Sequence, residues 1–158
     1  MKYKKDECIV FNSYNEHFVL SNMYPCKLQY KDRLFYGVEH LYYYLRFYEH
    51  REIQNKIMSK CKGVLANFNV KRIARENKEL IDNQTPRQRH TLLEKCIELK
   101  ANQCKEFREY LCSIPSDKHI VEFAYWGDTE YGCVLKGDTY EGDNVCGCIL
   151  EKVKASIL

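Results

Sequence analysis

Apolar residues recur at helical spacing in several stretches of the chain, and the longest stretch runs from about Arg87 to Cys112. Six residues there follow one another at intervals of three or four, which places them on one face of a helix: Leu93, Ile97, Lys100, Cys104, Phe107 and Leu111. The spacing predicts one continuous helix, ended by Ile114-Pro115-Ser116.

Shorter stretches show the same periodicity. Between Val38 and about Tyr48, Leu41, Tyr42 and Leu45 share one helix face with Val38. A second helix is expected over Arg51–Lys60, ending before Gly63. The region Val64–Ile81, which has many basic residues, and the last segment, about Val145–Ile157, are expected to be helical as well.

Three segments have the composition of strands. Cys8–Phe11 is a short apolar run, and Lys27–Leu34 is a strand candidate with a turn at Lys31-Asp32. His119–Tyr125 is expected to be a buried strand or extended segment. Residues 20–25 and the Gly/Asp-rich region Gly127–Asn144 are expected to be loops.

The length and charge fit a single globular domain over residues 1–158, since 158 residues suffice for one hydrophobic core. Aromatic residues make up 13 % of the chain, enough to line a pocket with flat, polar-tipped rings. The net charge of +3 is too small to argue for nucleic-acid binding, but it suits a phosphorylated ligand.

Nine cysteines are present, an odd number, and no secretory signal precedes them because the apolar run Cys8–Phe11 is too short. No stretch approaches the length of a membrane span, so we expect no membrane partner and a cytoplasmic protein with reduced thiols. Zinc is the alternative, but the only close pair is Cys146-Gly147-Cys148. Small apolar core thiols are therefore expected, with no metal and no cofactor.

Two titratable residues lie in apolar surroundings and need an explanation. Glu39 precedes an aromatic run, where it either pairs with Arg46 or a tyrosine or serves as an acid or base in a pocket. Lys100 interrupts the apolar stripe, where it either extends its ammonium to water or is held in a pocket as a nucleophile. His40 points away from Glu39 and is expected to be a core histidine that orients a neighbour.

A third candidate segment runs from Val121 to Asp128. Glu122 lies among apolar residues, and Trp126 is the only tryptophan of the chain. A lone Trp is most often a core residue, but Trp-Gly-Asp after a strand also suits a ring-stacking wall beside a polar contact. The chain has no Gly-x-Gly-x-x-Gly, Walker or Gly-x-Ser-x-Gly motif, which disfavours Rossmann, P-loop and α/β-hydrolase enzymes.

Taken in order, these segments resemble the YbiA-like/NADAR family. The resemblance spans about Phe11 to Val153, and five motifs carry it: Leu20-Ser21-Asn22-Met23-Tyr24-Pro25, Val38-Glu39-His40 with Arg46-Phe47, Lys100-Ala101-Asn102-Gln103, Val121-Glu122 with Trp126-Gly127, and Asn144-Val145-Cys146-Gly147. The sequence departs from the family pattern at Tyr43 (often Gln), Arg46 (commonly Lys), Ala101 (Phe) and Phe123 (an acid). These departures bear on the substrate more than on the fold.

The resemblance implies a compact, mostly helical α+β domain that hydrolyses an N-glycosidic bond between ribose and an exocyclic amine. Two substrate types are associated with the family: ADP-ribose on guanine, free or in a nucleic acid, and a phosphorylated ribosylamino-pyrimidine of riboflavin synthesis. The family is thought to use a lysine that forms a Schiff base with the sugar.

The resemblance also implies roles for residues of this chain. Lys100 would be the nucleophile and Glu39 would move protons. Arg46 would hold a phosphate and Trp126 would pack on the ligand. The remaining expected substrate contacts are Asn22, His40, Tyr43, Glu122, Gly127, Asp128 and Asn144.

Two other functions stay open. The domain could bind ADP-ribose or a related nucleotide without cleaving it, and the departures at Tyr43, Arg46 and Ala101 keep that alternative. A helical interaction domain without a pocket is the third, but it would leave Glu39 and Lys100 unexplained.

Overall fold

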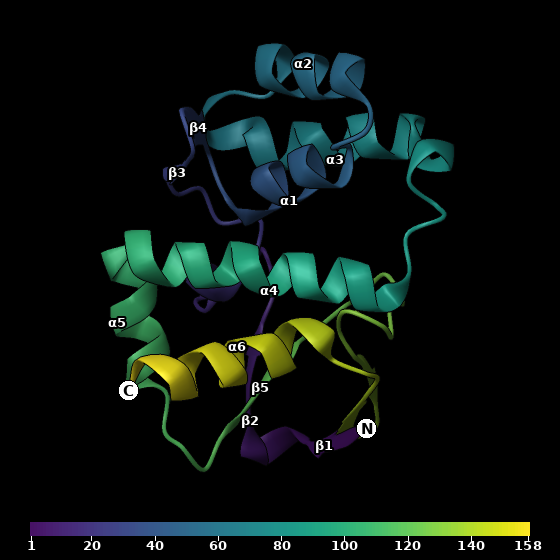
Figure 1. Ribbon diagram of the computed structural model, residues 1–158. Helices are drawn as coiled ribbons and strands as arrows, with labels where there is room; N and C mark the ends of the chain where they lie inside the picture. Colours follow the sequence, from purple (N-terminus) through teal and green to yellow (C-terminus); the bar gives the residue numbers. More distant parts are fainter. The chain divides into compact units, whose positions relative to one another are not determined.

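The computed structural model describes all residues, 1–158, and most of its regular structure is helical (Figure 1). The helices are α1 (Val38–Arg46), α2 (Arg51–Lys60), α3 (Ala66–Glu76), α4 (Pro86–Gln103), α5 (Lys105–Ser113) and α6 (Val145–Ile157). The strands are β1 (Lys2–Lys4), β2 (Cys8–Phe11), β3 (Leu28–Tyr30), β4 (Arg33–Phe35), β5 (His119–Glu122), β6 (Val134–Lys136) and β7 (Thr139–Glu141). Four 3-10 helices are Lys5–Glu7, Phe18–Leu20, Gly63–Leu65 and Lys78–Leu80. The expected mostly helical α+β class with a few short strands is confirmed.

The chain divides into two compact units. One comprises Asn22–Cys104, and the other comprises Met1–Ser21 together with Lys105–Leu158. The expected organisation of residues 1–158 as one domain stays a prediction.

The unit Asn22–Cys104 is built around α1, which packs against α2, α3 and α4. One cluster of buried apolar side chains in its core includes Phe47, directly after α1, Ile57 of α2 and Val70 of α3. Helix α4 begins at a capping box: Thr85 accepts from the Gln88 N–H, and the Gln88 side chain accepts from the Thr85 N–H. Pro86 occupies the first helical turn, where no backbone N–H is needed.

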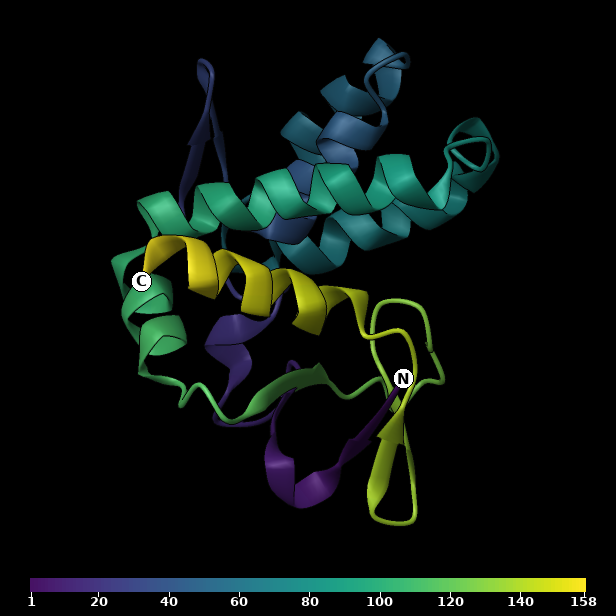
Figure 2. The ribbon, with the colours of Figure 1, turned by 60° about the horizontal axis from the view of Figure 1, so that its bottom comes forward.

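The unit formed by Met1–Ser21 and Lys105–Leu158 combines short strands with two helices. Strands β2 and β5 pair in parallel, while β1 and β6 both pair antiparallel with β7. Figure 2 shows the β6–β7 hairpin with β1 beside it. Helix α6 packs on β5 at Gly147, where an added Cβ would lie 2.0 Å from the Ile120 carbonyl oxygen.

Several predicted elements match the structure closely. Helices α2 and α6 have the predicted bounds, and β2 spans Cys8–Phe11 as expected. Lys27–Leu34 is a hairpin whose turn lies at Lys31-Asp32, and Lys31 takes the left-handed conformation there, with φ +53°. Helix α1 ends at Arg46, two residues earlier than predicted, and the basic region Val64–Ile81 contains α3 between two 3-10 turns.

The prediction of one helix from Arg87 to Cys112 is wrong. The backbone at Cys104 is extended (φ −109°, ψ 98°), so the segment forms α4 and α5 instead. Cys104 N–H still closes a helical hydrogen bond to the Lys100 carbonyl oxygen (2.8 Å). No Gly or Pro marks the break, and apolar spacing of three and four continues across it, so the pattern alone could not reveal it.

The prediction of a loop over Gly127–Asn144 is incomplete, because β6 and β7 form a hairpin within it. Gly137, with φ +65°, allows the tight turn between these three-residue strands.

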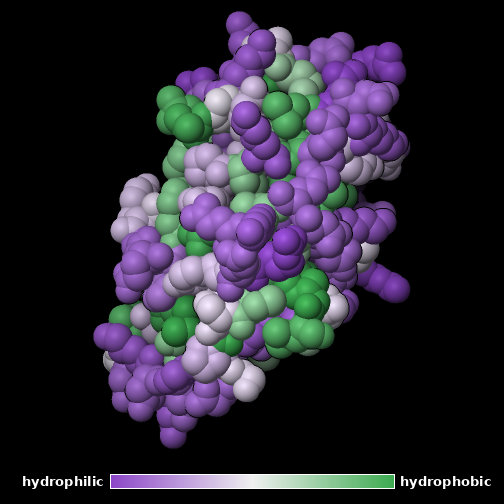
Figure 3. All heavy atoms as spheres, turned by 90° about the vertical axis from the view of Figure 1, so that its left-hand side faces the viewer, coloured by the Kyte–Doolittle hydropathy of each residue, from purple (hydrophilic) through white to green (hydrophobic).

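On the face of the molecule shown in Figure 3, hydrophobic side chains form several separate groups among hydrophilic ones. Such scattered exposure is ordinary for a protein surface.

Candidate functional site

The first turn of α1 is held by one buried side chain from α3. Asn67 Oδ1 accepts from the His40 N–H (3.0 Å), and its Nδ2 donates to the carbonyl oxygens of Met23 (3.2 Å) and Tyr36 (3.1 Å). A Cβ on Gly37 would lie 2.3 Å from that same Nδ2, so only glycine leaves room for the amide. This arrangement fixes where Glu39, one residue before His40, projects.

Glu39 has little solvent around it although it is not sealed from the surface. Burial raises the pKa of its carboxyl group, and the charges of Lys71 and Arg46 lower it in part. Its backbone N–H donates to the Asn22 carbonyl oxygen (3.1 Å), which ties α1 to the Leu20–Pro25 segment. A carboxyl group with a raised pKa that also faces the charges of two cations suits a group that gives and takes a proton.

Arg46 lies on the same side of α1 as Glu39 and is held in place by hydrogen bonds. Its Nε donates to Gln84 Oε1 (2.7 Å) and one terminal nitrogen donates to the Ile81 carbonyl oxygen (3.1 Å). Gln84 Nε2 donates back to the Arg46 carbonyl oxygen (2.8 Å). The guanidinium also lies 5.7 Å from the centre of the Tyr43 ring, within the range of a cation–π contact.

A cationic pocket of about 450 Å³ opens at this side of α1, entirely within the unit Asn22–Cys104. Asp82 is the only acid that lines it, and Lys78 pairs with that carboxylate (3.1 Å). Tyr43 and Gln84 add polar groups to the wall. The lining carries five cations, which makes it suited to phosphate: Arg46, Lys71, Arg75, Lys78 and Arg89.

Lys100 is buried, with 1 % of its surface exposed, so its ammonium does not reach water as a snorkelling lysine would. The Nζ atom lies 5.4 Å from the centre of the Tyr24 ring. Burial raises the pKa of the nearby Cys26 thiol to about 11, against the opposing charge of Lys100. Lys100 is therefore held beside Tyr24 and Cys26.

The Glu39 charge acts on α4 at Cys96, one helical turn before Lys100. Burial raises the pKa of the Cys96 thiol to about 12, and the Glu39 carboxylate adds to the effect. Cys96 lies one helical turn before Lys100, so the two share a face of α4. The charged groups that act on Glu39 itself are Lys71 and Arg46.

His40 is fully buried and supports the backbone, since its Nδ1 accepts from the Tyr36 N–H (3.1 Å). Burial lowers the pKa of its imidazole to about 4, and the Ile57 backbone opposes that shift. Nε2 points toward this backbone group without forming a hydrogen bond of normal geometry. His40 thus supports the backbone at the start of α1, and its contact with substrate stays a prediction.

Glu122 and Asn144 lie together in the other unit. Asn144 is 1 % exposed; its Oδ1 accepts from the Glu122 N–H (3.1 Å) and its Nδ2 donates to the Ile120 carbonyl oxygen (2.8 Å). It occupies the left-handed conformation at the start of α6 (φ +53°). The amide of Asn144 is thus used to join α6 to β5.

The segment Trp126-Gly127-Asp128 follows β5 in the same unit. Trp126 is 55 % exposed and its ring meets that of Tyr125 edge-on, with 5.0 Å between centroids. Gly127 has φ +99°, which favours glycine, and Asp128 Oδ1 accepts from the N–H groups of Glu130 (2.8 Å) and Tyr131 (3.1 Å). Asp128 therefore shapes the turn, while the Trp126 ring stays about half exposed beside Tyr125.

Sequence reasoning missed the partners of Glu39 and Arg46. Lys71, Arg75 and Lys78 are spaced by four and three residues, the spacing of one helical face, so the basic region did contain a signal for the pocket. Asn67 and Gln84 had no such signal, because their importance depends on groups distant in sequence.

No three His, Cys, Asp or Glu side chains come together in a way that could hold a metal ion, and all nine cysteines are free. No helix has the length and apolar character needed to cross a membrane.

Comparison with known proteins places these features in a family. A solved structure, the NMR structure of the E. coli protein YbiA, is similar to this one with a TM-score of 0.72 at 17 % sequence identity, over 98 % of this chain and 87 % of that chain. At that identity the likeness shows a common fold. No curated protein matches the sequence. The sequence model of the NADAR domain matches residues 4–158, and the chain therefore belongs to the NADAR domain family.

Proposed function

We propose that the protein hydrolyses an N-glycosidic bond between a phosphorylated ribose and an exocyclic amine of a base. The observation that carries the proposal is the Glu39 carboxyl, whose pKa is raised by burial and which is acted on by Lys71 and Arg46, two of the five cations that line the pocket. Membership of the NADAR family supports an N-glycosidase-like role. Two substrates fit this chemistry: ADP-ribose attached to guanine, and a ribosylamino-pyrimidine phosphate.

In the proposed reaction, the cationic pocket binds the phosphate and Arg46 contributes a planar, bidentate donor. Glu39 protonates the ring oxygen of the ribose, the C1–O bond breaks, and C1 becomes an imine with the base nitrogen. An exocyclic amine permits this ring opening because its nitrogen can supply the electron pair for the imine.

Lys100 then adds its amine to C1, and the base leaves as a free amine after taking up a proton. Water hydrolyses the lysine–sugar Schiff base, which releases the sugar aldehyde and restores the lysine. Burial beside Tyr24 favours Lys100 for this step because it keeps the amine away from bulk water.

Borohydride trapping tests the nucleophile. Reduction of the protein with substrate should leave a sugar adduct on the peptide that contains Lys100, and Lys100→Met should abolish it. Lys71→Met is the critical comparison, because Lys71 is the lysine that acts on Glu39. An adduct on Lys71, or none at all, would rule out Lys100 as the nucleophile. Lys56→Met, at an exposed position of α2, is the matched control.

A hydrolysis assay on both substrates side by side tests the function itself. We expect release of the free base from at least one, and a loss on the order of 10²-fold or more for Glu39→Gln. Saturable binding of ADP-ribose without release of a base from either substrate would instead identify a non-catalytic binding module.

A further inference from the structure

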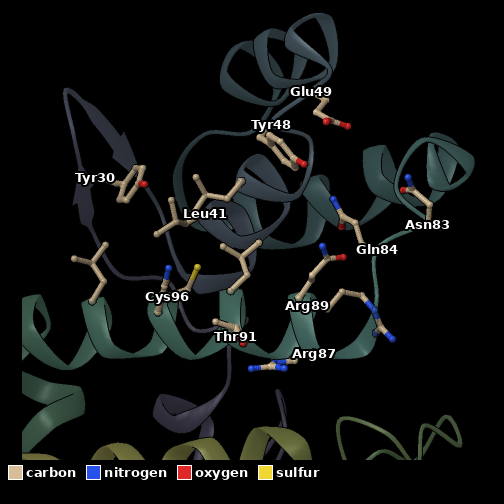
Figure 4. Close-up of a pocket in the computed structure, with 15 residues that line it drawn as sticks. Tyr30, Leu41, Tyr48, Glu49, Asn83, Gln84, Arg87, Arg89, Thr91 and Cys96 are labelled. Atoms are coloured by element: carbon tan, nitrogen blue, oxygen red, sulfur yellow. The ribbon is translucent and has the colours of Figure 1, made fainter.

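A groove of about 750 Å³ lies between α1 and α4 in the unit Asn22–Cys104 (Figure 4). Four leucines form an apolar floor: Leu41 and Leu45 from α1, Leu92 and Leu99 from α4. Its volume falls in the range of ligand pockets, which are mostly apolar with a few polar groups. On α4 the lining extends from Arg87 to Leu99, about 18 Å along the helix axis at ~1.5 Å per residue.

This groove is distinct from the pocket at Glu39. At ~100° per residue, Leu41 and Leu45 lie roughly 160° and 120° around the axis of α1 from Glu39. A ligand on the leucine floor would therefore face the opposite side of the helix. Gln84 and Arg89 line both cavities and mark the end where the two approach each other.

The rim indicates the chemistry of the ligand. Three cations line the groove (Arg87, Arg89 and Lys95), whereas Glu49 is the only acid. Tyr30 and Tyr48 add aromatic rings to the wall. Tyr48 leaves 66 % of its surface, much of it the apolar ring, exposed. Figure 4 shows Tyr30, Tyr48 and Leu41 around the same space above α4. This combination favours an anion with a flat, apolar body.

We propose that the groove between α1 and α4 is a second binding site, which takes a small aromatic molecule carrying a carboxylate, sulfonate or phosphate group. The aromatic body lies on the four leucines between Tyr30 and Tyr48. The anionic group lies at the α4 rim beside Lys95. The proposal does not rest on the hydrolysis proposed above: the four leucines belong to the groove alone, although Gln84 and Arg89 line both cavities.

Anilinonaphthalene sulfonate, an aromatic anion whose fluorescence rises in apolar surroundings, is a suitable probe. We expect the folded protein to bind one molecule per chain at the groove. Lys95→Glu should weaken binding about tenfold, as expected for loss of a charged hydrogen-bond donor. Leu99→Ser should also weaken probe binding, because it removes apolar surface from the floor of the groove. Lys56→Glu makes the same charge reversal on α2 and should leave the affinity unchanged.

Two further measurements make the test decisive. Near-UV circular dichroism must show native packing in each variant, since the probe also binds partly folded chains. Arg46→Met should leave probe binding intact, although it should impair hydrolysis through the cationic pocket. Equal affinities of Lys95→Glu and Lys56→Glu, loss of probe binding in Arg46→Met, or loss of binding as the protein self-associates would overturn the proposal.

Discussion

Acid should destabilise this protein through His40. The imidazole is fully buried, and its pKa falls from an ordinary 6.5 to about 4 in the folded state. In the unfolded chain the same group binds a proton below about pH 6.5. Between these values the unfolded state holds more protons, so the free energy of unfolding falls as the pH falls.

The size of the effect follows from the two pKa values. Their difference of about 2.5, at ~1.36 kcal/mol for each pH unit, corresponds to about 3 kcal/mol in total. Integration between pH 7 and pH 5 gives a loss of about 2 kcal/mol from this one group. Glu39 has the opposite effect on the free energy of unfolding. Its pKa is raised in the folded state, so the folded state binds the proton more tightly and is stabilised as the pH falls.

A comparison of variants isolates the contribution of His40. His40→Asn keeps an acceptor for the Tyr36 N–H but cannot take up a proton. Urea unfolding at pH 7 and pH 5 should show that the difference between the two stabilities shrinks by about 2 kcal/mol in this variant. His50→Asn, at a partly exposed position, should retain the dependence of the parent protein. An unchanged difference in His40→Asn would refute the assignment.

Three further predictions concern the neighbours of Glu39. Asn67→Ala removes the partner of three backbone groups and should lower the free energy of unfolding by about 3 kcal/mol or more, whereas Asn69→Ala on the same helix should change it little. Glu39→Gln should gain stability relative to the parent as the pH rises from 5 to 8 in urea unfolding, because the carboxylate that ionises with difficulty is gone; a difference independent of pH would contradict the raised pKa. Gln84→Met frees the Arg46 guanidinium from its side-chain acceptor and should raise KM for a phosphorylated substrate more than it lowers kcat. A fall in kcat as large as or larger than the rise in KM would show that Gln84 does not act through substrate binding.

The sequence predicted elements well where periodicity and end signals agree. Helices α2 and α6 have the predicted bounds, and the hairpin turn at Lys31-Asp32 was visible as polar residues between apolar ones. The break at Cys104 was missed because it depends on tertiary packing, with no Gly or Pro to announce it. Short strands such as β6 and β7 were missed since three residues are too few for a periodic signal.

Relations between site residues were likewise predictable where they depend on spacing within one helix, and not where they depend on tertiary packing. Glu39, Tyr43 and Arg46 share one helix face, so local spacing sufficed to bring Arg46 close to Glu39. Spacing could not show that Lys71 acts on the same carboxyl from another helix, because that depends on the packing of α3 against α1. Nor could it show that the amide of Asn144 is already engaged by β5.

The nine residues of α1 leave little mutational freedom in this helix. One side carries Glu39 and Arg46, the opposite side supplies Leu41 to the leucine floor, and His40 is enclosed in the interior. Most substitutions there would damage two properties at once. Changes in ligand preference would therefore arise more readily in α3 and α4, where Lys71 and Lys95 are exposed and can vary without disturbing a packed core.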